Sequence, residues 1–169
     1  QALTGSIASS HVIKWLRAWY SEGMPDAIDL EIVRQMLPST PYGAGVREIK
    51  PPVEIIGDAF EGMLARDPDD HAVWGIAYNG KARRERQRFT IAHELGHFIL
   101  HRSQKQSFNC DSQSVHTGID GLRQIEREAD EFASNLLMPG DLLREWIGMT
   151  VFDANTSTTW NYRGDERFP

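Results

Sequence analysis

One short motif constrains this chain more than any other feature: His-Glu-Leu-Gly-His at residues 93–97. On a helix, residues four positions apart lie about 40° apart around the axis and roughly 6 Å along it. His93 and His97 can therefore turn both imidazoles toward one point, as two ligands of a zinc ion. Glu94 lies beside that point, where its carboxylate can take a proton from an attacking water without occupying the metal. The spacing thus predicts a zinc-dependent hydrolase site on a helix.

The segment around the motif, residues 84–101, is predicted to be helical for independent reasons. Apolar residues recur there at helical spacing and define one face: Phe89, Ala92, Gly96, Ile99 and Leu100. Gly96 is unusual, because glycine costs about 1 kcal/mol relative to alanine inside a helix. A close-packed neighbour or a tight approach to the metal would explain it. Two histidines packed in a core without metal are the alternative, but histidine is scarce, with six in 169 residues, so we favour the metal.

The composition is that of an ordinary globular domain. The chain has 169 residues, of which 40% are hydrophobic and 25% charged, enough for one domain with a sizeable core. A net charge of −6 argues against direct nucleic-acid binding, and we interpret the basic cluster at residues 81–88 as a solvated helix start. No apolar run reaches membrane-spanning length. Because the first residues lack the layout of a secretion signal and Cys110 is the single cysteine, we expect a cytoplasmic protein.

Hydrophobic periodicity predicts an α+β fold in a single domain over residues 1–169. We expect an N-terminal helix within residues 1–25, a catalytic core over 26–140, and a C-terminal helix and tail over 141–169. The first helix is predicted at 9–22, capped by Ser9 or Ser10, with Val12, Trp15, Leu16 and Trp19 on its apolar face. The other predicted elements are helices at 29–37, 84–101, 122–138 and 141–148 and strands at 53–56, 61–66 and 72–78. Residues 102–121 are predicted to form a surface loop near the site.

A catalytic zinc needs a third protein ligand and one position left for water. The candidates are His101, Cys110, His116, Glu126 and Glu128. His101 lies about 12 Å from His93 along the helix axis, so we expect it to pack or to form hydrogen bonds. Cys110 and His116 fall in the polar stretch, where no predictable scaffold holds them.

Glu126 and Glu128 lie on the long helix predicted after the loop. Glu126 and Asp130 share one face, four residues apart, whereas Glu128 points about 200° away from Glu126. Glu126 could reach the metal while Asp130 accepts a hydrogen bond from the far nitrogen of a ligand histidine. An ordinary solvated charged face is the alternative.

The two helical segments together resemble the ImmA/IrrE family of zinc metallopeptidases. RFTIAHELGHFILH at 88–101 matches the metal helix of that family, and EREADEFASNLLMP at 126–139 matches its second helix. WGIAYNG, just upstream, is similar to the strand and turn that precede the motif. The resemblance implies that His93, His97 and Glu126 bind zinc and that Glu94 is the general base. Asp130 falls where thermolysin-like gluzincins place the acid that orients a ligand histidine.

The resemblance also implies a fold and a setting. The fold would be a minimal thermolysin-like zincin, with helices around a small, twisted, mainly antiparallel sheet. Known members act in the bacterial cytoplasm or in mobile elements, where they cleave or inactivate a helix-turn-helix repressor. We therefore expect an endopeptidase whose partner protein is a DNA-binding repressor, with a role in stress response or element transfer and no membrane or direct nucleic-acid contact.

Two alternatives stay open. The protein could be a regulatory binding module with a structural zinc, or a component of a toxin–antitoxin pair. A fourth ligand from Cys110 or His116 would favour a structural zinc, whereas three protein ligands favour an enzyme. An enzyme also needs a donor to the developing oxyanion, for which Tyr78, His101, His116 and an arginine are candidates. The strand at 74–78 is predicted to hold the substrate along a free edge.

Overall fold

The fold was obtained as a computed structural model, which describes residues 2–111, 120–140 and 143. Four helices are present in the described part of the chain: α1 (Gly5–Trp19), α2 (Leu30–Met36), α3 (Arg84–His101) and α4 (Asp120–Leu137). Two short 3-10 turns, Leu37–Ser39 and Pro41–Gly43, follow α2. Apart from residue 143, the predicted C-terminal helix and tail, like His116, lie outside the described residues. No helix in the described ranges has the length and apolar character needed to cross a membrane.

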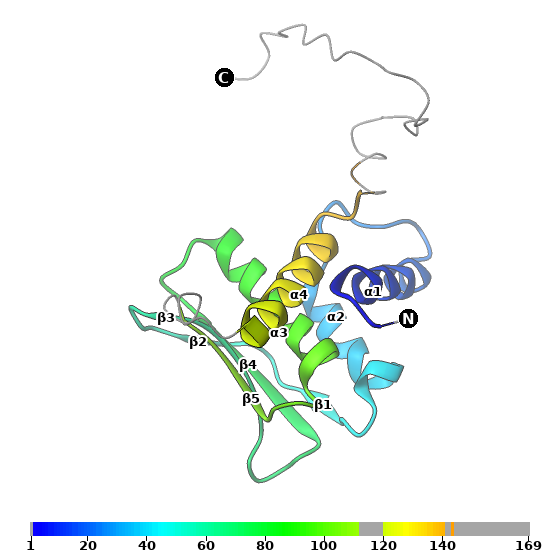
Figure 1. Ribbon diagram of the computed structural model, residues 1–169. Helices are drawn as coiled ribbons and strands as arrows, with labels where there is room; N and C mark the ends of the chain where they lie inside the picture. Colours follow the sequence, from blue (N-terminus) through cyan, green and yellow to red (C-terminus); the bar gives the residue numbers. More distant parts are fainter. Residues whose placement is uncertain (1, 112–119, 141–142, 144–169) are drawn as a thin grey trace, which may run out of the picture. The chain divides into compact units, whose positions relative to one another are not determined.

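A five-stranded mixed sheet lies against the helices (Figure 1). Its strands are β1 (Glu48–Ile49), β2 (Val53–Ile55), β3 (Phe60–Arg66), β4 (Val73–Asn79) and β5 (Ser107–Asp111). The order is β1-β4-β3-β5, and β2 also pairs with β4. The α+β prediction is confirmed. The sheet is mixed: the longer strands β3, β4 and β5 pair antiparallel, as expected, whereas the short strands β1 and β2 run parallel to β4.

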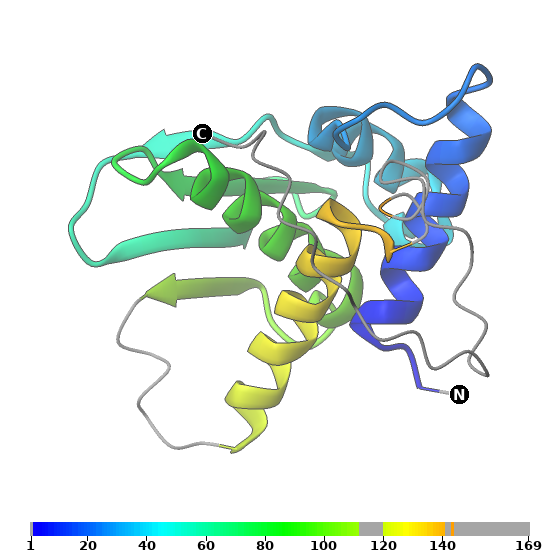
Figure 2. The same ribbon diagram turned by 90° about the horizontal axis from the view of Figure 1, so that it is seen from above.

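The position of β4 corrects one prediction. We expected its residues 74–78 to offer a free edge to a substrate, but β4 is bonded to β3 on one side and to β1 and β2 on the other. The sheet ends in β1 and β2 on one side and in β5 on the other, and Figure 2 shows β5 at the edge nearer to α4. Any peptide that extends this sheet near α4 must therefore pair with β5.

The strand β5 was not predicted, because the sequence analysis assigned residues 102–121 to a loop. The backbone of Ser107–Asp111 pairs antiparallel with β3, and Arg66 N–H donates to the carbonyl of Gln106 at 2.8 Å. Such a short polar segment has no period of its own, and its strand geometry comes from the partner that it meets. The second helix and the strands β2, β3 and β4 lie within a residue or so of their predicted bounds.

The first helix begins earlier than predicted. Thr4, not Ser9 or Ser10, is the N-cap, and its hydroxyl accepts a hydrogen bond from Ile7 N–H at 3.3 Å. The hydroxyls of Ser9 and Ser10 instead donate to the carbonyl of Ser6, each at 2.9 Å, which lets them lie inside a helix. The buried apolar face of α1 consists of Ala8, Val12, Ile13 and Leu16. Trp19, which was predicted to lie on that face, is 66% exposed.

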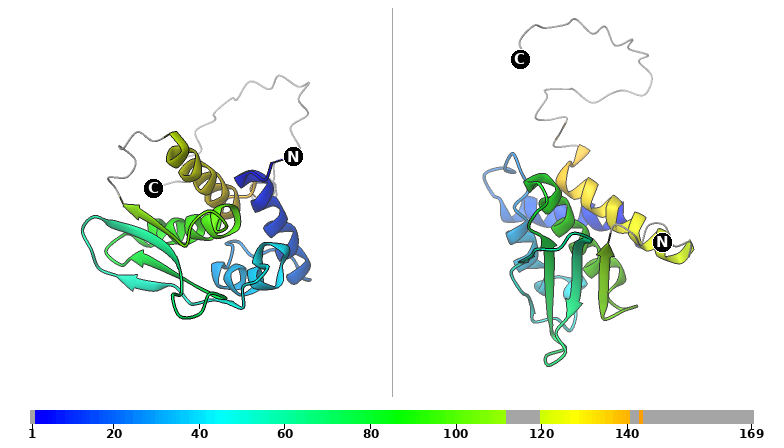
Figure 3. Two further views of the ribbon diagram at one scale, coloured as in Figure 1. Left: turned by 60° about the horizontal axis from the view of Figure 1, so that its bottom comes forward. Right: turned by 90° about the vertical axis from the view of Figure 1, so that its left-hand side faces the viewer.

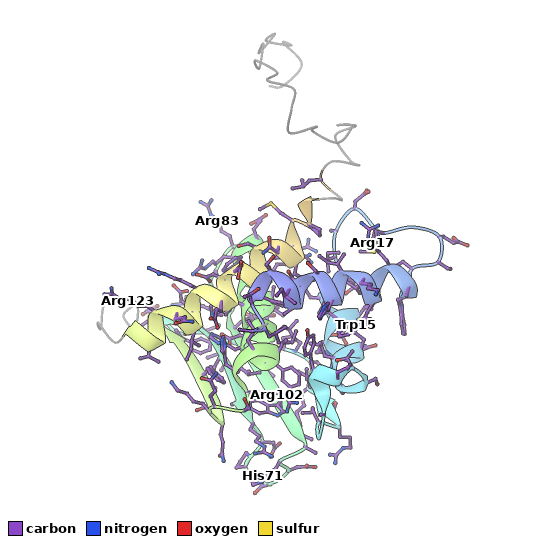
Figure 4. The ribbon with its side chains drawn as sticks, turned by 45° about the vertical axis from the view of Figure 1, so that its right-hand side comes forward. Trp15, Arg17, His71, Arg83, Arg102 and Arg123 are labelled. Carbon is purple, nitrogen blue, oxygen red and sulfur yellow. The ribbon has the colours of Figure 1, made fainter. Side chains whose placement is uncertain are left out.

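The helices form a layer in which α3 packs directly on β3 and β4, and α4 packs on α3 and α1 (Figure 3). The far end of α3 is tied down by Arg102, which donates to the carbonyls of Tyr42 at 3.1 Å and Ala44 at 2.9 Å. Trp15 of α1 meets the ring of the same Tyr42, with centroids 5.5 Å apart. Figure 4 labels both Arg102 and Trp15. These contacts hold α3 between the sheet and the other helices.

The close approach of α3 and α4 depends on Gly96. A Cβ atom at this position would lie 3.0 Å from Cδ1 of Phe132 and 3.2 Å from both Cα and the carbonyl oxygen of Ala129. Both of those residues belong to α4 and are fully buried. Gly96 therefore lets the backbones of the two helices meet, which is the close-packed neighbour that the sequence led us to expect.

Replacing Gly96 with valine should force the two helices apart. We expect Gly96→Val to lower the free energy of unfolding by about 1–3 kcal/mol, the usual cost of overpacking a core, and to weaken metal binding as well. Gly121→Val is the matched control, because nothing lies within 4 Å of a Cβ atom there. Urea denaturation measures the free energy of unfolding of both variants. Equal stability of the two variants would contradict the close packing.

Candidate metal centre

Three side chains meet where α3 faces α4. Nε2 of His93 lies 3.1 Å from one carboxylate oxygen of Glu126, and Nε2 of His97 lies 3.4 Å from the other. The three potential ligand atoms all lie within 4.8 Å of one another. The two imidazoles stand edge to face with ring centroids 4.6 Å apart. The structure therefore brings together the three residues that the sequence predicted as ligands, and they could hold a metal ion.

The donor set is well suited to such an ion. Asp130 accepts a hydrogen bond from Nδ1 of His93 at 2.9 Å, so the other ring nitrogen is the one that faces Glu126. A neutral imidazole would then point a lone pair at a carboxylate, which is favourable only if a proton or a cation lies between them. Two imidazole nitrogens and one carboxylate supply that cation with the ligand types of a catalytic metal site.

The electrostatics of the cluster show what a metal ion has to displace. Burial alone would lower the pKa of His93, but hydrogen bonds with Asp130 and Glu126 and the charge of Glu94 raise it to about 9. Burial lowers the pKa of His97. Burial would raise the pKa of Glu126, yet hydrogen bonds from both histidines hold it well below its usual range. At neutral pH and without metal, the imidazole of His93 is therefore protonated on both ring nitrogens.

Glu94 lies next to the cluster, fully buried on the side of α3 that faces the sheet. It packs against Gly62 of β3, where a Cβ atom would come within 2.7 Å of Oε1 of Glu94 and 2.4 Å of Cγ2 of Thr90. The missing side chain of Gly62 thus makes room for the carboxylate. Sequence reasoning missed this glycine, although glycine inside a strand is a signal of close approach.

His101 is a hydrogen-bonding residue, as the sequence predicted, and not a ligand. Its Nδ1 lies 3.1 Å from Nδ1 of His97, and its Nε2 lies 2.9 Å from a carboxylate oxygen of Glu128. The hydrogen bond from His101 holds the pKa of Glu128 below its usual value. Since both ring nitrogens of His101 are engaged, it is a poor candidate for the oxyanion donor. The sequence offered Glu128 as a candidate third ligand, but the structure places its carboxylate against His101 instead.

The strand β5 borders the cluster through Phe108. The ring of this residue stacks on that of His97, with centroids 4.8 Å apart and an angle of 12° between the planes, and Phe108 is only 5% exposed. The backbone of Cys110 pairs with that of Gly62. Sequence reasoning missed the contact of Phe108, because it placed this residue in a loop.

Two imidazoles from one helix, a carboxylate from its neighbour and a buried glutamate beside them form the arrangement of a metallopeptidase. The IrrE N-terminal-like domain, a peptidase family, matches residues 54–148, and the chain belongs to this family. This range contains both helices of the cluster.

Two known proteins show local similarity to the chain. It is 37% identical over 84 residues to the radiation response metalloprotease IrrE of Deinococcus deserti, a match that covers 49% of this chain and 28% of that protein. A stretch of 23 residues is 87% identical to beta-lactamase AER-1 of Aeromonas hydrophila, covering 14% of this chain and 8% of that protein. The chain thus spans less than a third of either relative, and the second match is too short to define a domain.

The raised pKa of His93 predicts how metal affinity depends on pH. A metal ion must displace the proton of His93, so the apparent zinc affinity should rise up to about tenfold per pH unit until the pH nears 9. Asp130→Asn removes one cause of the raised pKa, so its affinity should level off at a lower pH. Competition with a chelator of known pH dependence measures the apparent zinc affinity of the wild type and of Asp130→Asn at each pH. A wild-type affinity that stops rising above pH 6.5, the ordinary pKa of histidine, would contradict the cluster's electrostatics.

Proposed function

We propose that this protein is a zinc-dependent endopeptidase with a minimal thermolysin-like fold. The observation that carries the proposal is the buried Glu94 beside a cluster of His93, His97 and Glu126. Zinc suits two imidazole nitrogens and a carboxylate, and these three residues would hold it. A bound zinc ion would polarise the peptide carbonyl and acidify the attacking water.

The residues of the chain would perform the proton transfers. Glu94 takes a proton from the attacking water and delivers it to the leaving amine, as a general base and then a general acid. Gly62 leaves the space in which that carboxylate lies against β3. Asp130 holds the ring of His93 in one orientation through the hydrogen bond at Nδ1.

We place the substrate along the outer edge of β5. The hydrogen bond from Arg66 to Gln106 sets the alternation of the ladder, so the pair Leu64–Phe108 is bonded and the pair Met63–Asn109 is not. The backbone N–H and C=O of Asn109 therefore point away from β3. An extended peptide could pair with these groups, beside the residue that stacks on His97.

The partner that we propose is a DNA-binding repressor of the helix-turn-helix class, cleaved in the bacterial cytoplasm to relieve repression. Membership of the IrrE N-terminal-like family supports this proposal, and the name of the Deinococcus relative connects that protein with a radiation response. The acidic chain, with a net charge of −6, favours a protein partner over direct contact with DNA. A stress response or the transfer of a mobile element is the setting that we propose.

Substitution of Glu94 tests the proton transfer. Glu94→Gln should keep zinc bound and lower turnover by about 10²–10⁴-fold, the usual contribution of a general base. Glu85→Gln removes the same charge from an exposed position of the same helix and should leave turnover unchanged. Turnover of a quenched fluorescent peptide library and zinc content are the measurements. Wild-type turnover by Glu94→Gln would remove Glu94 from the mechanism.

Substitution of Asn109 tests the proposed substrate edge. Asn109→Pro removes one outward N–H while keeping the ladder to β3, because proline is tolerated where an edge N–H faces outward. We expect kcat/KM for peptides to fall roughly threefold to tenfold, the worth of about one hydrogen bond. Asn109→Ala keeps the N–H and should match the wild type. If Asn109→Pro folds normally and loses no kcat/KM, the substrate lies elsewhere.

A further inference from the structure

The two histidines of the metal cluster differ in how their outer nitrogens are held. Nδ1 of His93 meets the carboxylate of Asp130 directly, at 2.9 Å. Nδ1 of His97 meets another imidazole, that of His101, at 3.1 Å. The far nitrogen of His101 in turn lies 2.9 Å from the carboxylate of Glu128. Each imidazole is thus connected to a carboxylate on α4, one directly and one through an intermediate ring.

The chemistry of these groups fixes the direction of the hydrogen bonds. An ionised carboxylate only accepts, so the proton of a neutral His101 must be on Nε2, where it donates to Glu128. Nδ1 of His101 then carries a lone pair and accepts from His97. His97 must therefore hold its own proton on Nδ1, which leaves a lone pair on Nε2, the nitrogen that lies 3.4 Å from Glu126.

We propose that His101 and Glu128 form a relay that positions His97 and fixes its tautomer for metal binding. Glu128 acts through His101, and neither residue touches the metal or the substrate. The inference rests on the proposed metal site, although it does not depend on peptide cleavage. Asp130 orients His93 directly, and Glu128 orients His97 in the same way but through His101.

Burial and packing make the relay rigid. His97 and His101 are 0% and 1% exposed, so water does not compete for the hydrogen bond between them. Phe108 stacks on the ring of His97 and limits its rotation. The side-chain amide of Gln124 donates to the second oxygen of Glu128 at 2.9 Å, which holds the carboxylate in place. Such outer partners typically contribute about 10–100-fold to the metal affinity of a site.

The first test needs no substitution. Long-range ¹H–¹⁵N NMR spectra of the zinc-loaded wild-type protein report which nitrogen of each histidine carries the proton. We expect the proton of His101 on Nε2 and that of His97 on Nδ1. A proton on Nδ1 of His101 would overturn the relay. A residue that merely fills the core would impose no such pairing of tautomers.

The second test measures zinc affinity by chelator competition. His101→Phe keeps a ring of similar shape but removes the acceptor, so it should weaken zinc binding by about 10–100-fold. Glu128→Leu should also weaken it, and the double variant should bind zinc no more weakly than His101→Phe alone, because Glu128 acts only through His101. Glu131→Leu, at an exposed position of the same helix, should bind zinc like the wild type.

The outcomes separate the relay from the proposed function. If the wild-type protein binds no zinc, the proposed function fails. If the wild type binds zinc and folded His101→Phe binds it equally well, only the relay fails. Additive losses in the double variant would likewise overturn the relay, since they would mean that Glu128 acts by a separate path.

Discussion

The close contact between α3 and α4 at Gly96 is the constraint on which the rest of the site depends. A Cβ atom there would come within 3.2 Å of the backbone of Ala129. Glu126 lies one turn of α4 before Ala129, and its carboxylate spans both imidazoles of α3 only at this separation. The helical spacing of the motif presents two ligands, but the third depends on how closely a second helix can approach.

The same contact gives the site its charge. Two carboxylates of α4, those of Glu126 and Asp130, face His93 from different sides, and Glu94 adds its charge from α3, the helix of His93. This excess of negative charge stabilises a proton on His93 in the absence of metal and would stabilise a cation in its place. The sheet contributes the opposite side of the site, where Gly62 admits the carboxylate of Glu94 and Phe108 covers His97.

The parts that could be predicted from the sequence are those set by local spacing. Helical periodicity predicts both helices of the cluster and the side of α4 that faces α3. It also places Asp130 where it can accept the hydrogen bond from His93. The strand β5 could not be predicted, because its backbone geometry comes from pairing with a strand more than forty residues earlier in the chain. Two further contacts also join segments that are distant in the sequence: that of His101 with Glu128 and that of Glu94 with Gly62. No local sequence pattern predicts either of them.

The central claim is that one zinc ion is held by two imidazoles of α3 and the carboxylate of Glu126. An anomalous difference map, collected at the zinc edge from crystals of the zinc-loaded protein, tests it most directly. The account predicts one strong peak in contact with Nε2 of His93, Nε2 of His97 and the carboxylate of Glu126, with no fourth protein ligand. A peak whose ligands exclude Glu126, or include the sulfur of Cys110 or the ring of His116, would contradict the account.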